Sequence, residues 1–211
     1  HARYIAARLA RHANVEVLTN CARDYITWRN ELPAGTDSVN GLSVKRFKVS
    51  RERNPSDFGK LSQHVFGELH SIADELKWLQ AEGPTSPELI DYLLQDTNRY
   101  DYVIFFSYRY YHAYQGIRLI PQRAILVPTA ERDPALGLAI FRPTFRAVRA
   151  VMYNSYEEQS LIHKVSENEH VPGVVVGVGS EVPETASPER FRHRAEITGD
   201  FMPVSYTHLR A

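Results

Sequence analysis

Apolar residues recur along the chain in two alternating patterns, and these patterns predict a succession of helices and strands. Apolar positions spaced three and four residues apart predict helices, including a long one over 58–79. Short apolar runs bounded by turn residues predict strands. The predicted helices cover 1–13, 58–79, 87–95, 133–149, 156–165 and 187–194, and the predicted strands cover 15–19, 100–106, 123–129, 150–155 and 170–179.

Turn and capping residues mark the ends of some of these elements. Asn40 and Gly41 stand between two apolar arms, which predicts a β-hairpin. Ser155 and Glu158 have the spacing of a capping box and predict the start of a helix. Pro143 falls inside a predicted helix, so we expect it to kink that helix.

The alternation of strands with helices predicts the fold class. It indicates α/β units, and therefore a Rossmann-like, mainly parallel sheet with helices on both faces. Ligands of such sheets bind beyond the carboxyl ends of the strands. Four segments rich in charged, polar and aromatic residues follow predicted strands, and we expect them to form one rim: residues 20–29, 107–112, 129–133 and 154–155.

The first of these segments, TNCARDYITWRN, carries chemistry that a simple turn does not need. Asp24 and Arg29 can supply directed hydrogen bonds, and Tyr25 offers a ring and a hydroxyl group to a ligand. Trp28 is expected to pack beneath them as a support. The alternative is that the aromatic residues cap the core edge and the charged ones only solvate it. Cys21 is expected to be a buried filler rather than a nucleophile.

The second segment, FFSYRYYHAYQG, crowds aromatic residues behind a strand. Tyr108, Arg109 and Tyr110 leave the strand end first, so they are the candidates for the rim. Tyr111 and Tyr114 are expected to face the core.

The third segment, TAERDPAL, places ionisable residues where a strand passes into a helix. Asp133 fits the start of the helix, where negative charge is favourable. Glu131 lies at the strand tip and is a candidate for a hydrogen-bonding or base role.

Composition narrows the classes of protein. The 211 residues are 43% hydrophobic and 24% charged, which is typical of a globular chain. Lys plus Arg and Asp plus Glu number 25 each, which argues against nucleic acid as the main partner. One cysteine excludes an internal disulfide framework. No residues have the spacing of a metal site, and no apolar run approaches the roughly 20 residues that span a bilayer.

The order of several motifs resembles the N-terminal half of GT-B glycosyltransferases of family 4, which are retaining enzymes that use nucleotide sugars. The motifs are VEVLTNCARDYITWRNELPAG, VNGLSVKRF, YDYVIFFSYRYY, ILVPTAERDPAL, MYNSYEEQSLI and VPGVVVGVG with PERFR, and they span about residues 1–198. The resemblance implies an acceptor-side domain over 1–180 that lacks its first strand, and a hinge and start of a donor domain over 181–198. Residues 199–211 show no periodicity and resemble a translated sequencing adaptor, so we expect them to be a non-native tail.

The resemblance also assigns roles to residues. Asn154 and Ser155 would face the cleft and the donor. Glu131 and Arg132 stand where the family often has His-Asp, so the family's histidine role does not carry over, and Glu131 remains the catalytic candidate. The residues expected to bind the acceptor are Asp24, Tyr25, Arg29, Tyr108, Arg109, Tyr110 and Arg132.

The implied reaction transfers a sugar from a nucleotide sugar to an acceptor hydroxyl group with retention of configuration. The nucleotide sugar is a co-substrate, no further cofactor or metal is expected, and the acceptor is a sugar, a lipid-linked or a small molecule. The resemblance implies a cytoplasmic enzyme with an option of peripheral membrane contact, and an inactive fragment over 1–211. The alternatives are a non-catalytic sugar- or nucleotide-binding module and the N-domain of a GT-B-like UDP-sugar epimerase.

Overall fold

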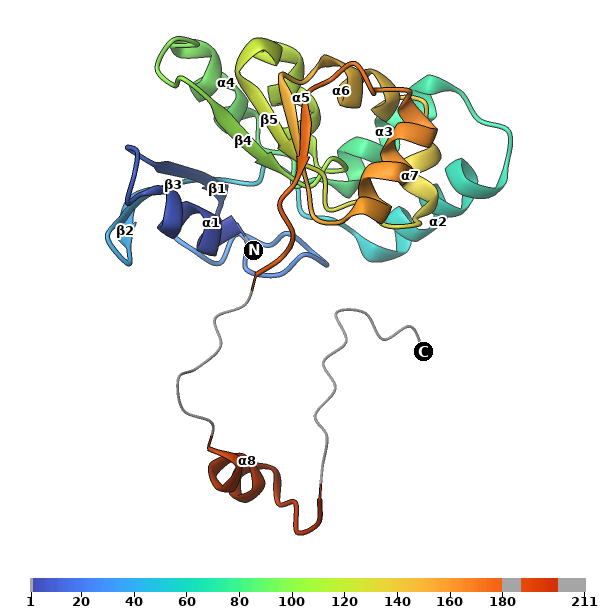
Figure 1. Ribbon diagram of the computed structural model, residues 1–211. Coiled ribbons are helices and arrows are strands. Elements are labelled where there is room, and N and C mark those ends of the chain that lie inside the picture. Colours follow the sequence, from blue (N-terminus) through green and yellow to red (C-terminus); the bar gives the residue numbers. More distant parts are fainter. Residues whose placement is uncertain (1, 180–186, 201–211) are drawn as a thin grey trace. The chain divides into compact units, whose positions relative to one another are not determined.

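The computed structural model describes residues 2–179 and 187–200. The chain divides into two compact units, His1–Val178 and Gly179–Ala211. The first unit contains all the strands of the described residues (Figure 1). The second unit is described over helix α8 (Pro188–Ala195), which begins with a proline in its first turn. Part of the predicted hinge and most of the predicted tail lie outside the described residues, within 180–186 and 201–211.

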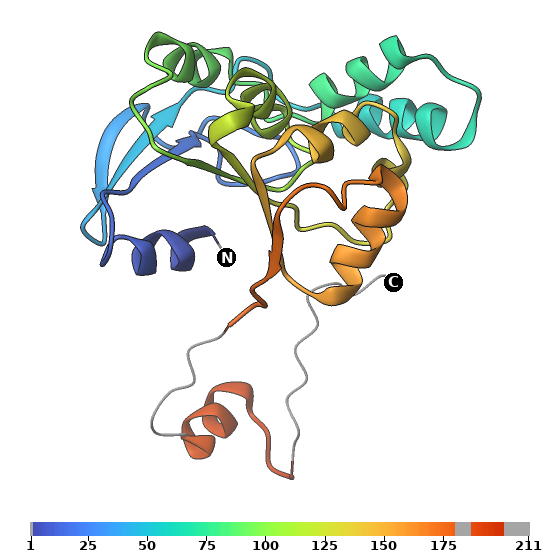
Figure 2. The same ribbon diagram turned by 45° about the horizontal axis from the view of Figure 1, so that its top comes forward.

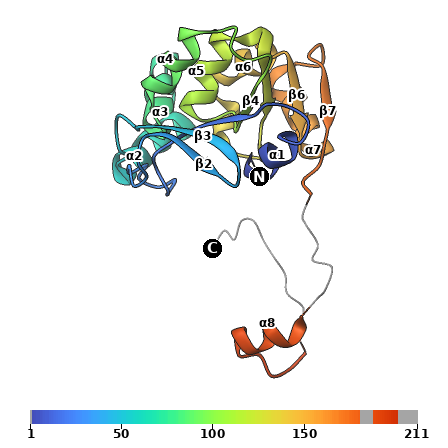
Figure 3. The same ribbon diagram turned by 90° about the vertical axis from the view of Figure 1, so that its left-hand side faces the viewer.

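A four-stranded parallel sheet confirms the predicted α/β, Rossmann-like fold. Its order is β4-β5-β6-β7, and every neighbouring pair is parallel. Figure 3 shows β6 and β7 side by side at one edge of this sheet. The strands are β4 (Val103–Phe106), β5 (Ala124–Val127), β6 (Ala150–Tyr153) and β7 (Gly173–Val175). The helices between and before them are α4 (Pro87–Gln95), α5 (Tyr111–Leu119), α6 (Phe141–Ala147) and α7 (Tyr156–Ser166).

The remaining strands form a second sheet of order β1-β3-β2, so the prediction of one sheet was wrong. Asn40 and Gly41 turn the antiparallel β2–β3 hairpin with positive φ angles of 52° and 78°, as the sequence predicted. Among the described residues, β1 pairs only with β3 and β4 only with β5. β1 and β4 are therefore edge strands, and no described strand lies between them to join the two sheets. The strands are β1 (Glu16–Asn20), β2 (Gly35–Val39) and β3 (Leu42–Phe47).

The long helix predicted over 58–79 is two helices, α2 (Pro55–Gly67) and α3 (Ile72–Glu82). Ser71 caps the second helix: its hydroxyl oxygen accepts from the backbone N–H of Asp74, whose carboxylate accepts from the backbone N–H of Ser71. This capping box starts a new helix although the apolar spacing continues through it.

The helix predicted over 133–149 is also divided. A 3₁₀ turn, η2 (Pro134–Gly137), precedes α6. Pro143 lies in the first turn of α6, where a helix needs no backbone N–H from it. The predicted kink is therefore absent.

The core lies under the helices of the parallel sheet and is rich in aromatic rings. Phe141 makes edge contacts with Trp78, Tyr108 and Tyr114, with ring centroids 6.3, 4.9 and 6.2 Å apart. Helix α1 (Ala2–Leu9) stands outside this core, because none of its residues is buried.

Candidate functional site

Three residues with unusual backbone conformations follow the strands on the predicted rim. Trp28, Ser107 and Thr129 have positive φ angles of 57°, 65° and 49°. Residues other than glycine rarely adopt this region, and those that do concentrate at functional sites. The rim is therefore the first place to look for a binding site.

Side-chain contacts join the four predicted segments, as the sequence analysis expected. Trp28 meets Tyr110 edge to face, with ring centroids 5.5 Å apart. The guanidinium of Arg109 lies 2.5 Å from the carboxylate of Asp133. The carboxylate of Glu158 accepts from the backbone N–H of Ala130 in the third segment, and from that of Asn154 in the fourth.

Trp28 is the support that the sequence predicted. Its side chain is 8% exposed, and its indole Nε1 donates to the backbone oxygen of Glu82 at 2.7 Å. The ring of Tyr25, three residues earlier, is 70% exposed. The loop therefore has a fixed aromatic base and an exposed aromatic ring.

A buried ion network lies next to Trp28. Glu82 Oε2 is 2.7 Å from Arg53 Nη2, and Glu82 Oε1 is 2.7 Å from Arg109 Nε. Arg109 continues to Asp133, so two cations and two anions alternate. Arg53 also donates to the backbone oxygen of Tyr25 at 2.8 Å. The network thus ties together the loops that follow β1, β3, α3, β4 and β5.

Burial and charge pairing oppose each other in this network. Burial raises the pKa of Glu82, and the guanidinium groups of Arg109 and Arg53 offset part of that rise. Burial lowers the pKa of Arg53, while Glu82 acts against this change. For Arg109, burial pushes the pKa down, but Glu82 and Asp133 outweigh it and the pKa is raised. The four charges sum to zero, so the network suits a rigid support.

Tyr108 is a correction to the sequence analysis, which placed it on the rim. Its side chain is 1% exposed and packs on Phe141 and Phe145. Backbone N–H groups of Ser107 and Tyr108 donate to the oxygens of Val127 and Pro128, which hold this stretch along β5. Tyr108 therefore stays in the core, where burial raises its pKa.

Two other candidates of the first loop have partners within the chain. The carboxylate of Asp24 accepts from the backbone N–H groups of Ile26 and Thr27 at 2.7 and 2.6 Å, and these bonds help to lower its pKa. Arg29 is largely exposed and lies 3.7 Å from Glu52. Asp24 shapes the loop, whereas the Arg29 side chain can reach a ligand.

The candidates near β5 and β6 also fall into two groups: exposed residues that a ligand can reach, and half-buried residues that stabilise the local structure. Glu131 and Arg132 are exposed at the tip of the third segment. Asn154 and Ser155 are half-buried and serve helix α7: Asn154 donates its backbone N–H to Glu158 at 2.5 Å, and the Ser155 hydroxyl oxygen accepts from the backbone N–H of Glu158 at 3.1 Å. Burial raises the pKa of Glu158, and the hydrogen bonds from Asn154 and Ala130 oppose that rise.

A recess of about 200 Å³ opens beside Trp28. Trp28 and Phe58 contribute ring surface, and the guanidinium of Arg53 lies over both rings, 5.2 and 4.5 Å from their centroids. Side chains of both charges complete the wall, among them Arg51 and Asp57. Ring surface combined with a few polar groups is typical of a site for a polar organic ligand.

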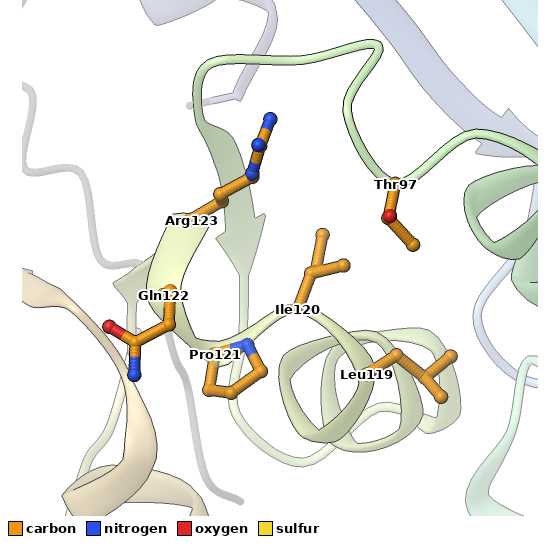
Figure 4. Close-up of a pocket in the computed structure, with 6 residues that line it drawn as sticks. All are labelled: Thr97, Leu119, Ile120, Pro121, Gln122 and Arg123. Carbon is orange, nitrogen blue, oxygen red and sulfur yellow. The ribbon is translucent and has the colours of Figure 1, made fainter.

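A second recess, of about 210 Å³, lies away from the rim. Figure 4 shows that its lining residues come from the end of α5, the turn η1 (Pro121–Arg123) and the loop after α4. Most of its lining residues come directly before β5 in the sequence, so the recess lies at the amino end of that strand. Arg123 is engaged there with the backbone oxygen of Tyr100 and with Asn98. The recess beside Trp28 is therefore the better candidate.

Arg53 and Glu82 were not predicted as site residues from the sequence. One signal was available for Glu82, because it stands in the last turn of a helix, where negative charge is unfavourable. A residue that breaks a local rule often has a tertiary role. Nothing local marked Arg53.

Within residues 2–179 and 187–200, no group of three or more histidine, cysteine, aspartate or glutamate residues could hold a metal ion. No helix in these ranges is long and apolar enough to cross a membrane. Comparison of the chain with protein-family models, curated proteins and solved structures finds no match.

Proposed function

We propose that the Rossmann-like unit binds the acceptor of a retaining glycosyltransferase that uses a nucleotide sugar. The order of motifs and the parallel sheet support this proposal. The observation that carries it is the rim itself, where an exposed Tyr25 ring and the recess beside Trp28 offer aromatic surface next to charged side chains. Sugars are bound by ring surface for their apolar faces and by directed hydrogen bonds for their hydroxyl groups.

The network beneath the rim prepares the site before a ligand arrives. Arg53, Glu82 and Arg109 hold the loops in place with buried ion pairs. A site that is already ordered loses less conformational entropy on binding. In this proposal Tyr25 stacks on the acceptor, and Arg29 and Arg51 donate hydrogen bonds to its oxygens.

The reaction would exchange one bond at the anomeric carbon. The bond to the diphosphate oxygen of the nucleotide sugar breaks, and a bond to the acceptor oxygen forms on the same face of the sugar. The proton of the acceptor hydroxyl group leaves with the diphosphate product. Glu131 is exposed at a strand tip and is the carboxylate that we assign to the cleft.

Binding measurements on the purified chain test the proposal. A panel of simple sugars and oligosaccharides is titrated and followed by NMR chemical shifts. We expect one class of sugar to shift the signals of the rim, and Tyr25→Ala to weaken its binding about tenfold through loss of ring stacking. Tyr102→Ala is the matched control, because Tyr102 is exposed near the amino end of β4.

A nucleotide that binds this rim while every sugar fails would contradict the proposal. That result would favour the nucleotide-binding module instead.

One observation favours a sugar-binding module without catalysis as the second candidate. The carboxylates of Asp24, Asp133 and Glu158 all accept backbone hydrogen bonds, so they serve the structure of the loops. The test joins this chain to a donor domain and measures turnover of nucleotide sugars. If the chain binds sugar but the joined protein turns over no nucleotide sugar, the result favours this module over a transferase.

A further inference from the structure

His70 lies in the connection between α2 and α3, and both of its ring nitrogens face oxygen atoms. Its Nδ1 is 2.9 Å from the backbone oxygen of Glu68, and its Nε2 is 3.1 Å from Oε1 of Glu75. The connection comprises residues 68–71, and Figures 1 and 2 show it at the outer end of the two helices. The imidazole therefore joins this connection to helix α3.

The two oxygens determine how many protons the imidazole of His70 must carry. A backbone oxygen and a carboxylate oxygen can only accept hydrogen bonds. A neutral imidazole has one N–H group, whereas the imidazolium has two. Both contacts are therefore hydrogen bonds only in the protonated form. In the neutral form, the lone pair of one ring nitrogen faces an oxygen atom.

Glu75 connects His70 to a third helix. Its side chain is buried, and its two carboxylate oxygens accept from the backbone N–H groups of Ala139 and Ile140 at 3.1 and 2.9 Å. Ile140 directly precedes helix α6. A buried carboxylate is more stable beside a cation than beside a neutral group. The protonation of His70 therefore affects both the connection and the start of α6.

The other charged groups near His70 pair with one another. The imidazole of His64 on α2 lies 2.7 Å from the carboxylate of Glu68, and the rings of the two histidines are 6.4 Å apart. On α3, Asp74 lies 3.1 Å from Lys77. The hydrogen bonds of His70 to the backbone of Glu68 and to the buried carboxylate raise its pKa, while desolvation opposes this rise and Asp74 adds to it.

We propose that His70 is a pH-sensitive latch: its imidazolium holds the α2–α3 connection against Glu75, and the loss of one N–H proton at higher pH releases the connection. The folded pKa of His70 is raised, so the latch is closed below the ordinary pKa of histidine and opens as the pH rises through the folded value. This inference does not depend on the proposed function, because the latch needs no ligand.

The first test uses the unmodified chain. In an NMR titration, the backbone amide signals of Ala139 and Ile140 should shift with the same midpoint as the imidazole carbons of His70, because all three groups contact Glu75. Hydrogen exchange is then measured at about pH 5.5 and about pH 8.5 and corrected for the exchange rate of an unstructured peptide. Protection of the hydrogen-bonded amides of Glu68 and Ser71 should be about tenfold lower at the higher pH.

Two substitutions at His70 and one control separate the latch from its neighbours. His70→Gln is neutral at every pH, so it should remove the pH dependence and leave the connection poorly protected throughout. His70→Arg keeps a charge and donates in more than one direction, so protection should persist at both pH values. His64→Gln is the matched control: it removes the neighbouring imidazole and should leave the pH dependence in place. Circular dichroism should show that the variants are folded.

Three outcomes would overturn the proposal. The first is equal protection of Glu68 and Ser71 at both pH values in the unmodified chain, a result that needs no variant. The second is a titration of the Ala139 and Ile140 amides that persists in His70→Gln. The third is a titration that disappears in His64→Gln, since the responsible group would then be the other histidine.

Discussion

Arg53 and Glu82 are 29 residues apart in the sequence, and their side chains meet at 2.7 Å with 9% and 5% of their surfaces exposed. A buried carboxylate in contact with two guanidinium groups is stable only as a complete set, because each partner offsets the desolvation of the others. The pair lies beneath the loop that carries Trp28, whose indole donates to the backbone oxygen of the same Glu82. Stability and the shape of the rim are therefore linked at this residue.

We expect Glu82→Gln to destabilise the domain by about 3–5 kcal/mol, because it leaves the buried charge of Arg53 without its carboxylate partner and Arg109 with Asp133 as its remaining one. Urea unfolding followed by circular dichroism measures this loss. Glu52→Gln is the control: Glu52 forms an exposed pair with Arg29, so its loss should cost at most about 1 kcal/mol. Equal effects of the two substitutions would show that the network contributes no more than a surface ion pair.

His112 should titrate near pH 4, because burial lowers the pKa of its imidazole from 6.5 to about 4. The folded pKa is below the unfolded one, so the stabilising contribution is complete above pH 6.5 and is lost as the pH falls towards 4. His112→Gln should reduce the loss of stability in that window.

His70 is an internal reference for the same experiment. The hydrogen bond to the backbone oxygen of Glu68 and the contact with Glu75 raise its pKa above 6.5. Its contribution therefore has the opposite sign: it is complete below pH 6.5 and is lost as the pH rises through the folded pKa. NMR titration of the imidazole carbons follows both residues at once, and a reversed order of the two midpoints would contradict this assignment.

Cys21 should resist alkylation in the folded protein. Its side chain is 0% exposed, and burial raises the pKa of the thiol, which reduces the fraction of reactive thiolate. We expect iodoacetamide to modify Cys21 only in urea, as peptide mass spectrometry would show. Rapid modification without denaturant would mean that this strand end opens readily or that the thiol is activated.

Arg29→Ala should separate binding from stability in the first loop. The ion pair of Arg29 with Glu52 is exposed, so the free energy of unfolding should change by at most about 1 kcal/mol. Sugar binding at the rim should weaken about tenfold, through loss of a charge-assisted hydrogen bond. Arg23→Ala is the matched control, since Arg23 is an exposed arginine of the same loop. A large loss of stability with unchanged binding would make Arg29 a structural residue.

The strands of the parallel sheet were predictable because buried strands are short, continuous apolar runs. The helix over 58–79 was predicted incorrectly because Leu69 and Ile72 keep the helical spacing, although Ser71 and Asp74 start a new helix. The capping signal was present in the sequence. The apolar spacing conceals it, because the steps of three and four residues continue from α2 into α3.

The rim was predictable in outline and not in detail. Parallel strands bring their carboxyl ends to one edge, which explains why the segments after β4, β5 and β6 lie together. The first segment follows β1 of the other sheet and meets them through side-chain contacts such as that of Trp28 with Tyr110. Tyr108 was misplaced because hydrogen bonds to Val127 and Pro128 keep it in the core, and these bonds cannot be read from local sequence. The contact of Arg53 with Glu82 depends on the tertiary fold for the same reason.

The separation of the two sheets has a consequence for local unfolding of the domain. β1 and β4 each leave one row of backbone groups without a strand partner among the described residues, so no ladder of hydrogen bonds transmits stability from one sheet to the other. Side-chain anchors do so instead: Glu16 with Tyr100 and Arg99, and Trp28 with Glu82. The small sheet can therefore detach as its own cooperative unit, and its amide protons should exchange with deuterium sooner than those of β5. A ligand that binds the rim would slow this exchange, because it would join the loop after β1 to the loops of the parallel sheet.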